Sequence, residues 1–190
     1  MPHVFESASS GRAKCRGCGV AIAKGELRFG ERLPNPFADG EITHWFHPRC
    51  AAFKRPEPLV QALGESGEGI PGRDDLERIA RASLAHSRLQ RIDGAERAPS
   101  GQAKCRSCHV PIERGTWRVR LVFHEEGQFA PGGFVHLACC GTYFESVDLF
   151  EPLLHFSSAL SDADREELRR ELGASLGDRP LGLPAKGSVP

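Results

Sequence analysis

The sequence CRGC at residues 15–18 and the sequence HPRC at residues 47–50 decide the fold. They form two close pairs of sulfur and imidazole side chains, with 28 residues between the pairs. A structural Zn²⁺ is held by four such ligands in tetrahedral geometry. The two pairs therefore predict a zinc ion that ties two distant parts of the chain together. The expected ligands are Cys15, Cys18, His47 and Cys50.

The same pattern returns in the second half of the chain. Residues 105–108 read CRSC and residues 136–139 read HLAC, with 27 residues between them. Two copies at nearly the same interval favour metal binding over structural cysteines without a metal. Four protein ligands leave no position for water, which favours a structural over a catalytic zinc. We expect two zinc ions per chain. The expected ligands of the second are Cys105, Cys108, His136 and Cys139.

The cysteine count and the apolar pattern bear on the compartment. The chain has seven cysteines, of which Cys140 stands outside the two quartets. Cys140 could replace Cys139 as a ligand, but the HxxC pattern of the first copy favours Cys139. An odd number at metal-like spacing fits a reducing compartment better than a set of disulfides. Neither a secretory signal nor an apolar stretch long enough to span a bilayer is visible, so we expect a soluble intracellular protein.

The repeat also predicts the domain organisation. We expect one domain at residues 5–92, a second at residues 98–173, a linker at residues 94–99, and a disordered tail at residues 174–190 that is rich in Gly and Pro. Short strands lead to the HxxC pairs in both copies. Apolar residues at helical spacing predict a helix over residues 75–90 that packs on the first zinc site. A second helix is expected to begin after Ser161 and to end at Gly173. These are small zinc-stabilised α+β domains.

Three segments of the first copy carry a resemblance to a known family. They are SGRAKC at residues 10–15, KGELR at residues 24–28 and HWFHPRC at residues 44–50. With these, the first half resembles the zinc finger of poly(ADP-ribose) polymerases, which is also found in one eukaryotic DNA ligase. The resemblance covers residues 5–90 and, more loosely, residues 95–172. It implies two tandem fingers, each a short antiparallel sheet with a packed helix. The chain leaves no room for a catalytic domain, so we expect no enzyme.

The resemblance implies recognition of DNA breaks such as ends, nicks and gaps. In this family one surface grips the phosphate backbone, while a loop presents apolar side chains to the exposed base stack. Carried over, Arg12 and Arg28 would contact phosphates, and the planar guanidinium fork suits phosphate oxygens. Phe37 and Ile42 would lie against the exposed base pair. Stacking of a base on an aromatic ring contributes about 1–3 kcal/mol and is tolerant of sequence.

The second copy departs from this pattern. Gln102 stands where the first copy has Arg12, although Arg118 matches Arg28. Its loop carries two glutamates, and Phe129 is the apolar candidate near the turn. Arg118 and Phe129 are its expected DNA contacts. The second copy is expected to bind DNA weakly, or to serve a protein partner or self-association instead.

The charge balance limits the expected affinity and leaves a rival function open. The chain has 25 Lys and Arg against 25 Asp and Glu, while residues 1–60 have nine against six. Few phosphates can be neutralised, so the salt dependence of DNA binding should be shallow. The rival is a zinc-stabilised adaptor that binds proteins and not DNA. A DNA-binding role would place the protein at the nucleoid in the cytoplasm of a bacterium, or in the nucleus of a eukaryote.

Overall fold

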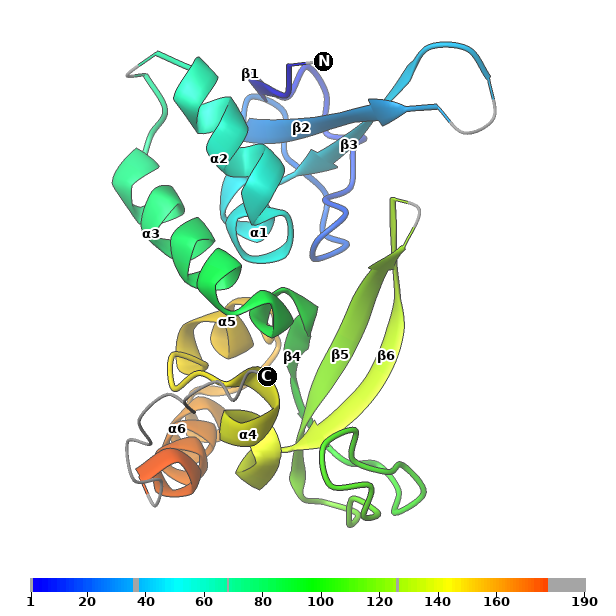
Figure 1. Ribbon diagram of the computed structural model, residues 1–190, viewed down its shortest axis with the longest axis vertical. Coiled ribbons are helices and arrows are strands. Elements are labelled where there is room, and N and C mark those ends of the chain that lie inside the picture. Colours follow the sequence, from blue (N-terminus) through cyan, green and yellow to red (C-terminus); the bar gives the residue numbers. More distant parts are fainter. Residues whose placement is uncertain (1, 36–37, 68, 126, 178–190) are drawn as a thin grey trace, which may run out of the picture.

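The computed structural model describes residues 2–35, 38–67, 69–125 and 127–177 (Figure 1). The described chain contains two three-stranded antiparallel sheets, each followed by helices, which confirms the expected pair of small α+β units. We call residues 4–91 the first repeat and residues 92–177 the second repeat. Among the described residues, no helix combines the length and the apolar character that crossing a membrane requires.

The first sheet has the strand order β1-β2-β3. Its strands are β1 (Val4–Ser7), β2 (Leu27–Pro34) and β3 (Glu41–Phe46). Phe29 on the central strand is opposite Phe5 on one side and Phe46 on the other. Phe29 and Phe46 are fully buried, and their ring centroids lie 6.3 Å apart. This row of aromatic side chains stabilises the sheet, because cross-strand aromatic pairs contribute favourable contacts.

Three helices follow the first sheet. They are α1 (Pro48–Lys54), α2 (Pro56–Glu65) and α3 (Arg73–Ala85), and a 3-10 turn η1 (Ser87–Arg91) ends the repeat. Pro56 begins α2. Proline suits the first helical position, where its missing N–H has no partner to lose. The helix expected over residues 75–90 is α3, and it ends earlier.

The first strand of the second repeat overlaps the expected linker. Its sheet has the order β4-β5-β6 and consists of β4 (Ile92–Arg97), β5 (Trp117–Glu125) and β6 (Gln128–His136). Residues 94–97 therefore belong to a strand, which corrects the prediction of a linker over residues 94–99. Gly94 has φ +102°, and a Cβ there would lie 2.3 Å from the carbonyl oxygen of Phe156. Glycine thus lets β4 lie directly on the helical layer of this repeat.

The remaining elements are short, apart from the last one. They are η2 (Leu137–Cys139), α4 (Cys140–Phe144), α5 (Phe150–His155) and α6 (Asp162–Gly177). The Ser161 hydroxyl accepts a hydrogen bond from the N–H of Asp164 at 3.2 Å, as the expected helix start requires. The expected end at Gly173 was wrong, since α6 continues to Gly177 and includes the first residues of the expected tail. Residues 178–190 lie outside the described residues.

The two repeats share one core. The cluster of buried apolar side chains runs from Ala8 in the first repeat to Leu172 in the second. Figure 1 shows the long β5–β6 hairpin reaching towards the first repeat, while the β2–β3 hairpin extends away from the rest of the molecule. On the other side of the contact, the rings of Phe53 in α1 and Phe156 after α5 lie 5.8 Å apart. The repeats are therefore packed against each other at two places.

Candidate metal centres and their surroundings

The first predicted quartet comes together at the base of the first sheet. One ligand atom from each of Cys15, Cys18, His47 and Cys50 lies within 4.8 Å of the others. Cys15 and Cys18 lie on a tight turn in which the Gly19 N–H donates to the Cys15 carbonyl oxygen at 2.8 Å. The other pair spans the start of α1, where His47 is the N-cap residue. The strand β3 delivers this pair to the turn.

The distances inside the first cluster fit a tetrahedral zinc ion. His47 Nδ1 lies 3.4 Å from Cys18 Sγ and 3.8 Å from Cys50 Sγ. With Zn–N of about 2.0–2.1 Å and Zn–S of about 2.3 Å, a tetrahedron places such a nitrogen and sulfur about 3.6 Å apart. The other ring nitrogen, Nε2, lies 3.7 Å from a Glu26 carboxylate oxygen. A partner of this kind fixes the orientation of a metal-binding imidazole.

The second cluster repeats this geometry. Cys105, Cys108, His136 and Cys139 also bring their ligand atoms within 4.8 Å of one another. His136 Nδ1 lies 3.4 Å from Cys108 Sγ and 3.9 Å from Cys139 Sγ, and its Nε2 lies 3.2 Å from the carbonyl oxygen of Pro111. Cys140 is not part of this cluster. It is buried, and its thiol donates a hydrogen bond to the His136 carbonyl oxygen at 3.3 Å. The two Cys3His clusters fit two zinc ions per chain, as predicted.

The two clusters shift the pKa values of their ligands in different directions. Burial on its own would raise the pKa of Cys105, but the N–H groups of Cys108, His136 and Ser107 lower it to about 7. In the first cluster the Cys15 and Cys18 sulfurs raise the pKa of His47 to about 10. A proton and a zinc ion therefore compete for that imidazole, and metal binding releases the proton.

The expected DNA contacts of the first repeat lie in different surroundings. Arg12 is exposed beside the cysteine turn, and Ile42 is half-buried on β3, opposite Leu33. Phe37 lies outside the described residues. Arg28 on β2 is buried: its side chain is 9% exposed and donates to Glu6 at 2.5 Å. Its guanidinium also lies 3.6 Å from the ring centroid of Trp45.

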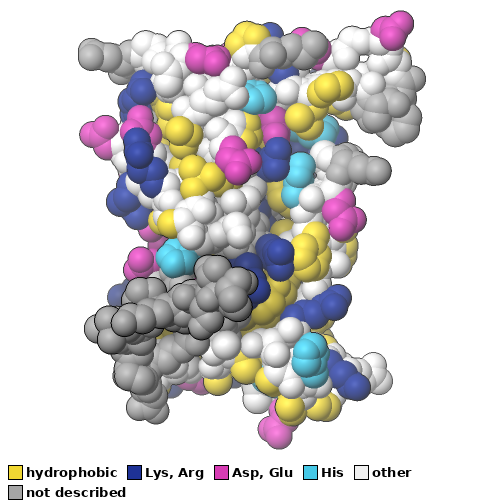
Figure 2. Space-filling model, in the orientation of Figure 1, with side chains coloured by type: hydrophobic (Ala, Val, Ile, Leu, Met, Phe, Trp, Pro, Cys, Tyr) yellow, Lys and Arg dark blue, Asp and Glu magenta, His cyan; other side chains and the backbone are white. Residues whose placement is uncertain are grey.

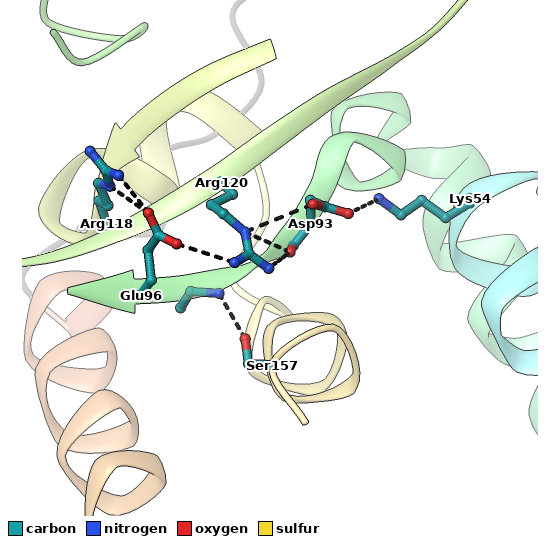
Figure 3. A network of polar contacts seen from close by, with 7 residues as sticks. Lys54, Asp93, Glu96, Arg118, Arg120 and Ser157 are labelled. Carbon is teal, nitrogen blue, oxygen red and sulfur yellow. Dashed lines mark hydrogen bonds and ion pairs between the residues drawn. The ribbon is translucent and has the colours of Figure 1, made fainter. Parts of the chain in front are cut away.

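Arg118 occupies the equivalent place in the second sheet. Its side chain is 7% exposed and donates to Glu96 at 2.5 Å, and its guanidinium lies 3.5 Å from the ring centroid of Phe134. Glu96 also accepts from Arg120, which in turn donates to the carbonyl oxygen of Asp93 (Figure 3). Both central arginines thus have an acidic and an aromatic partner within the chain, and this internal pairing is a feature that the sequence analysis did not anticipate.

Phe129 lies between the repeats. Its ring meets that of Phe46 edge-on, with centroids 6.4 Å apart, and lies 4.9 Å from the ring of His124. Nearby, the Arg16 side chain donates to Gln128 at 2.9 Å. The tip of the β5–β6 hairpin therefore rests on the first repeat and turns Phe129 towards Phe46. A contact of Phe129 with DNA would require this packing to open, and it stays a prediction.

We call this contact the hairpin junction, formed by His124, Gly127, Gln128 and Phe129 with Arg16, His44, Phe46 and Arg55. Arg55 is held between the two repeats, because it pairs with the buried carboxylate of Glu31 and lies 3.2 Å from His124 Nδ1. His44 is buried, and a Cβ on Gly127 would lie 2.5 Å from its ring. No spacing rule could have indicated this contact, since its partners are separated by 69 to 112 residues.

Comparison with known proteins agrees with this geometry. Residues 6–86 match the family described as the Poly(ADP-ribose) polymerase and DNA-Ligase Zn-finger region. The chain is 29% identical to Poly [ADP-ribose] polymerase 1 of Gallus gallus over 92% of its own length and 19% of the relative. It is 27% identical to Poly [ADP-ribose] polymerase of Drosophila melanogaster over 90% of its length and 19% of the relative.

A relative of another kind matches over a similar stretch. The chain is 26% identical to Polynucleotide 3'-phosphatase ZDP of Arabidopsis thaliana, over 89% of its own length and 28% of the relative. The chain spans about a fifth of the length of the two polymerases it matches. The match therefore concerns both repeats and not the remainder of these longer proteins.

Proposed function

We propose that this protein, in which residues 6–86 match the Poly(ADP-ribose) polymerase and DNA-Ligase Zn-finger region, binds DNA at breaks through its first repeat. The observation that carries the proposal is the contrast between the two hairpins. The β2–β3 hairpin extends away from the rest of the molecule, whereas the tip of the β5–β6 hairpin rests on the first repeat (Figure 1). Only a projecting hairpin can lie against an exposed base pair.

The proposed DNA surface combines charge beside the cysteine turn with apolar side chains on the projecting hairpin. Arg12 is exposed and would contact a phosphate, and Ile42 with Phe37 would cover the base pair at the break. For Arg28 to reach a phosphate, its guanidinium has to leave Glu6 or be shared with it. For Arg118 and Phe129 to contact DNA, Arg118 would have to leave Glu96 and Phe129 would have to leave Phe46. The proposed DNA surface is therefore on the first repeat.

The proposed role is binding without catalysis by this chain. Both metal clusters have four protein ligands, which is the arrangement of structural zinc. The names of the relatives add context: one relative is a polynucleotide 3'-phosphatase and others are poly(ADP-ribose) polymerases. A binding module of this kind brings a protein to DNA ends. It would act at the nucleoid in the cytoplasm of a bacterium, or in the nucleus of a eukaryote.

Fluorescence anisotropy with three probes tests the proposal. The probes are a duplex closed by hairpins, the same duplex with one nick, and the same duplex with a blunt end, at one stated salt concentration. The zinc-loaded protein is expected to bind the nicked or blunt-ended duplex more tightly than the closed one. Equal and weak binding to all three would overturn break recognition.

A matched pair of variants tests the surface. Arg12→Gln and Gln102→Glu each lower the net charge by one, and the two exposed positions correspond between the repeats. Arg12→Gln is expected to weaken binding to nicked DNA several-fold and to reduce the slope of log K against log salt by about 0.9, the value for one lost phosphate contact. Gln102→Glu should stay within about two-fold of wild type. Equal effects of the two changes would contradict the assignment of Arg12.

A zinc-stabilised protein adaptor is the second candidate function. The face shown in Figure 2 intermixes Lys and Arg with Asp and Glu, so this face has no wide basic patch among its described residues. Such a surface suits a protein partner as well as it suits DNA. A partner that survives nuclease treatment, together with equal binding to all three DNA probes, would favour the adaptor. Self-association through the second repeat remains a prediction, to be checked by sedimentation.

A further inference from the structure

Helix α1 carries the last ligand of the first zinc cluster and turns one face to the second repeat. Four of its residues, at positions i, i+1, i+4 and i+5, make these contacts, and residues four apart lie on the same side of a helix. Arg49 pairs with Glu151 of α5, and the ring of Phe53 lies 5.1 Å from that of His155. Lys54 pairs with Asp93 of β4 at 3.3 Å. The fourth residue is Cys50, the metal ligand itself.

The contact of Cys50 comes from the imidazole of His155. His155 Nε2 lies 3.1 Å from Cys50 Sγ, although the residues are 105 positions apart in the chain. Cys50 is only 1% exposed, so little water reaches the sulfur on this side. The imidazole packs against two aromatic rings, 5.1 Å from Phe53 and 4.7 Å from Phe156, centroid to centroid. The ring is therefore held with its nitrogen at the sulfur.

We propose that His155 donates a hydrogen bond from Nε2 to the Cys50 thiolate and acts as a positioning residue for the first zinc ion. A zinc-bound thiolate keeps lone pairs that accept hydrogen bonds, and such outer partners orient ligands and tune metal affinity. The donor comes from the second repeat. The second repeat thus completes the first metal centre and slows loss of its zinc.

The second cluster provides an internal comparison. Within the described part of the chain, the sulfurs of Cys105, Cys108 and Cys139 have no hydrogen bond from the first repeat, and Cys108 is exposed. In the described part of the chain, the first cluster alone therefore has a ligand sulfur in contact with an imidazole of the other repeat. The effect of removing that contact should be confined to the first site.

Two substitutions of His155 separate hydrogen bonding from packing. His155→Phe keeps a flat ring against Phe53 and Phe156 but has no donor. His155→Gln gives up the ring and keeps an N–H that can reach the sulfur. His86→Phe is the matched control, because it makes the same chemical change in a residue that is not hydrogen-bonded to either cluster among the described residues.

The measurements report on each metal site directly. Chelator competition gives zinc affinity and release rate, and NMR of the protein loaded with ¹¹³Cd gives one resonance per site. His155→Phe is expected to weaken the first site by about 10-fold or more, the usual effect of losing such a partner, and to shift only one cadmium resonance. His155→Gln should recover much of the affinity, and His86→Phe should match wild type.

Two results would overturn the proposal. One is a His155→Phe protein that retains the wild-type affinity at both sites and leaves both cadmium resonances in place. The other is an equal loss in His155→Phe and His155→Gln, with both resonances moved, which would mean that His155 only holds the repeats together. Neither readout involves DNA, so the outcome is independent of the proposed DNA binding.

Discussion

Arg28 and Arg118 have the same three-part surroundings in the two sheets. Each is on a central strand, each pairs with a glutamate of the preceding strand, and each lies over an aromatic ring at 3.5 to 3.6 Å. A guanidinium gains from both kinds of partner, through a charge-assisted hydrogen bond and a cation–π contact. The charge counted from the sequence is thus partly neutralised inside the fold. Arg12 is exposed and lies outside these pairs.

Gly127 permits a first prediction at the scale of one residue. It has φ +76°, and a Cβ would lie 2.5 Å from the buried ring of His44. Gly127→Ala is expected to lower the free energy of unfolding by about 2–3 kcal/mol, because the left-handed backbone costs roughly 1–2 kcal/mol and the overlap adds to it. Urea unfolding of the zinc-loaded protein measures the change.

Gly115→Ala is the control for that change. Gly115 has φ +83°, and no atom lies within 4 Å of the Cβ position. This variant should lose only the backbone part, about 1–2 kcal/mol. If the two alanine variants lose equal stability, the hairpin tip does not press on His44 as the structure shows.

Helix α1 is short, yet it connects three parts of the molecule. Its seven residues follow a zinc ligand directly, and five of them are buried. Lys54 at its end is 1% exposed, and its ammonium lies 4.5 Å from the ring centroid of Phe156 and 5.3 Å from that of Phe129. Burial lowers the pKa of Lys54 to about 8, although the carboxylate of Asp93 acts in the opposite direction. The charged ammonium therefore depends on Asp93.

A double-mutant cycle on this pair gives the second prediction (Figure 3). Asp93→Asn leaves a buried ammonium without its carboxylate and is expected to cost about 3 kcal/mol of unfolding free energy. Lys54→Met removes the charge and fills the same space, so its stability should lie within about 1 kcal/mol of wild type or above it. The double variant should recover most of the Asp93→Asn loss, as measured by denaturant unfolding at pH 7.

Additive losses in that cycle would show that Lys54 and Asp93 are not coupled. Asp93 also contacts Arg120, so the cycle separates its two partners. Arg120 is more exposed than Lys54, and exposed pairs contribute little. The buried lysine is therefore expected to account for most of the coupling.

At the scale of the whole molecule, the sequence predicted the local units but not how they are joined. The eight ligands and the sheets followed from short spacings, such as Cys15 to Cys18, and from turn residues. The β4 strand was missed because Gly94 and the polar residues after it resemble a linker. The hairpin junction was missed because contacts such as Arg16 with Gln128 join residues 112 positions apart. Phe129 in this junction had a simpler interpretation as a DNA contact.

The hairpin junction makes stability depend on pH, which is the third prediction. Burial lowers the pKa of both His44 and His124, and Arg55 acts in the same direction while Glu31 opposes it. The unfolded chain binds protons at these histidines near pH 6.5, where the folded protein does not. Stability is therefore fully present above about pH 6.5 and is lost as the pH falls below it.

Unfolding in urea at a series of pH values between 5 and 8, with zinc in excess, measures this loss. Protonation of the metal ligands contributes in the same range, so the comparison is made with His124→Phe. This variant removes one of the two buried imidazoles and should show a shallower slope below pH 6.5. A slope equal to that of wild type would mean that His124 does not contribute.

The face that α1 turns to the second repeat also limits how such a chain can evolve. A gene that kept only the segment of residues 6–86 would encode a helix in which Phe53 and Lys54 lack the aromatic rings of the second repeat that pack on them. Its metal ligand Cys50 would lack the contact with His155. The lone finger would need new residues at those positions before it could be transferred to another protein. We therefore expect the effect of a substitution on one side of this contact to depend on the residues on the other side.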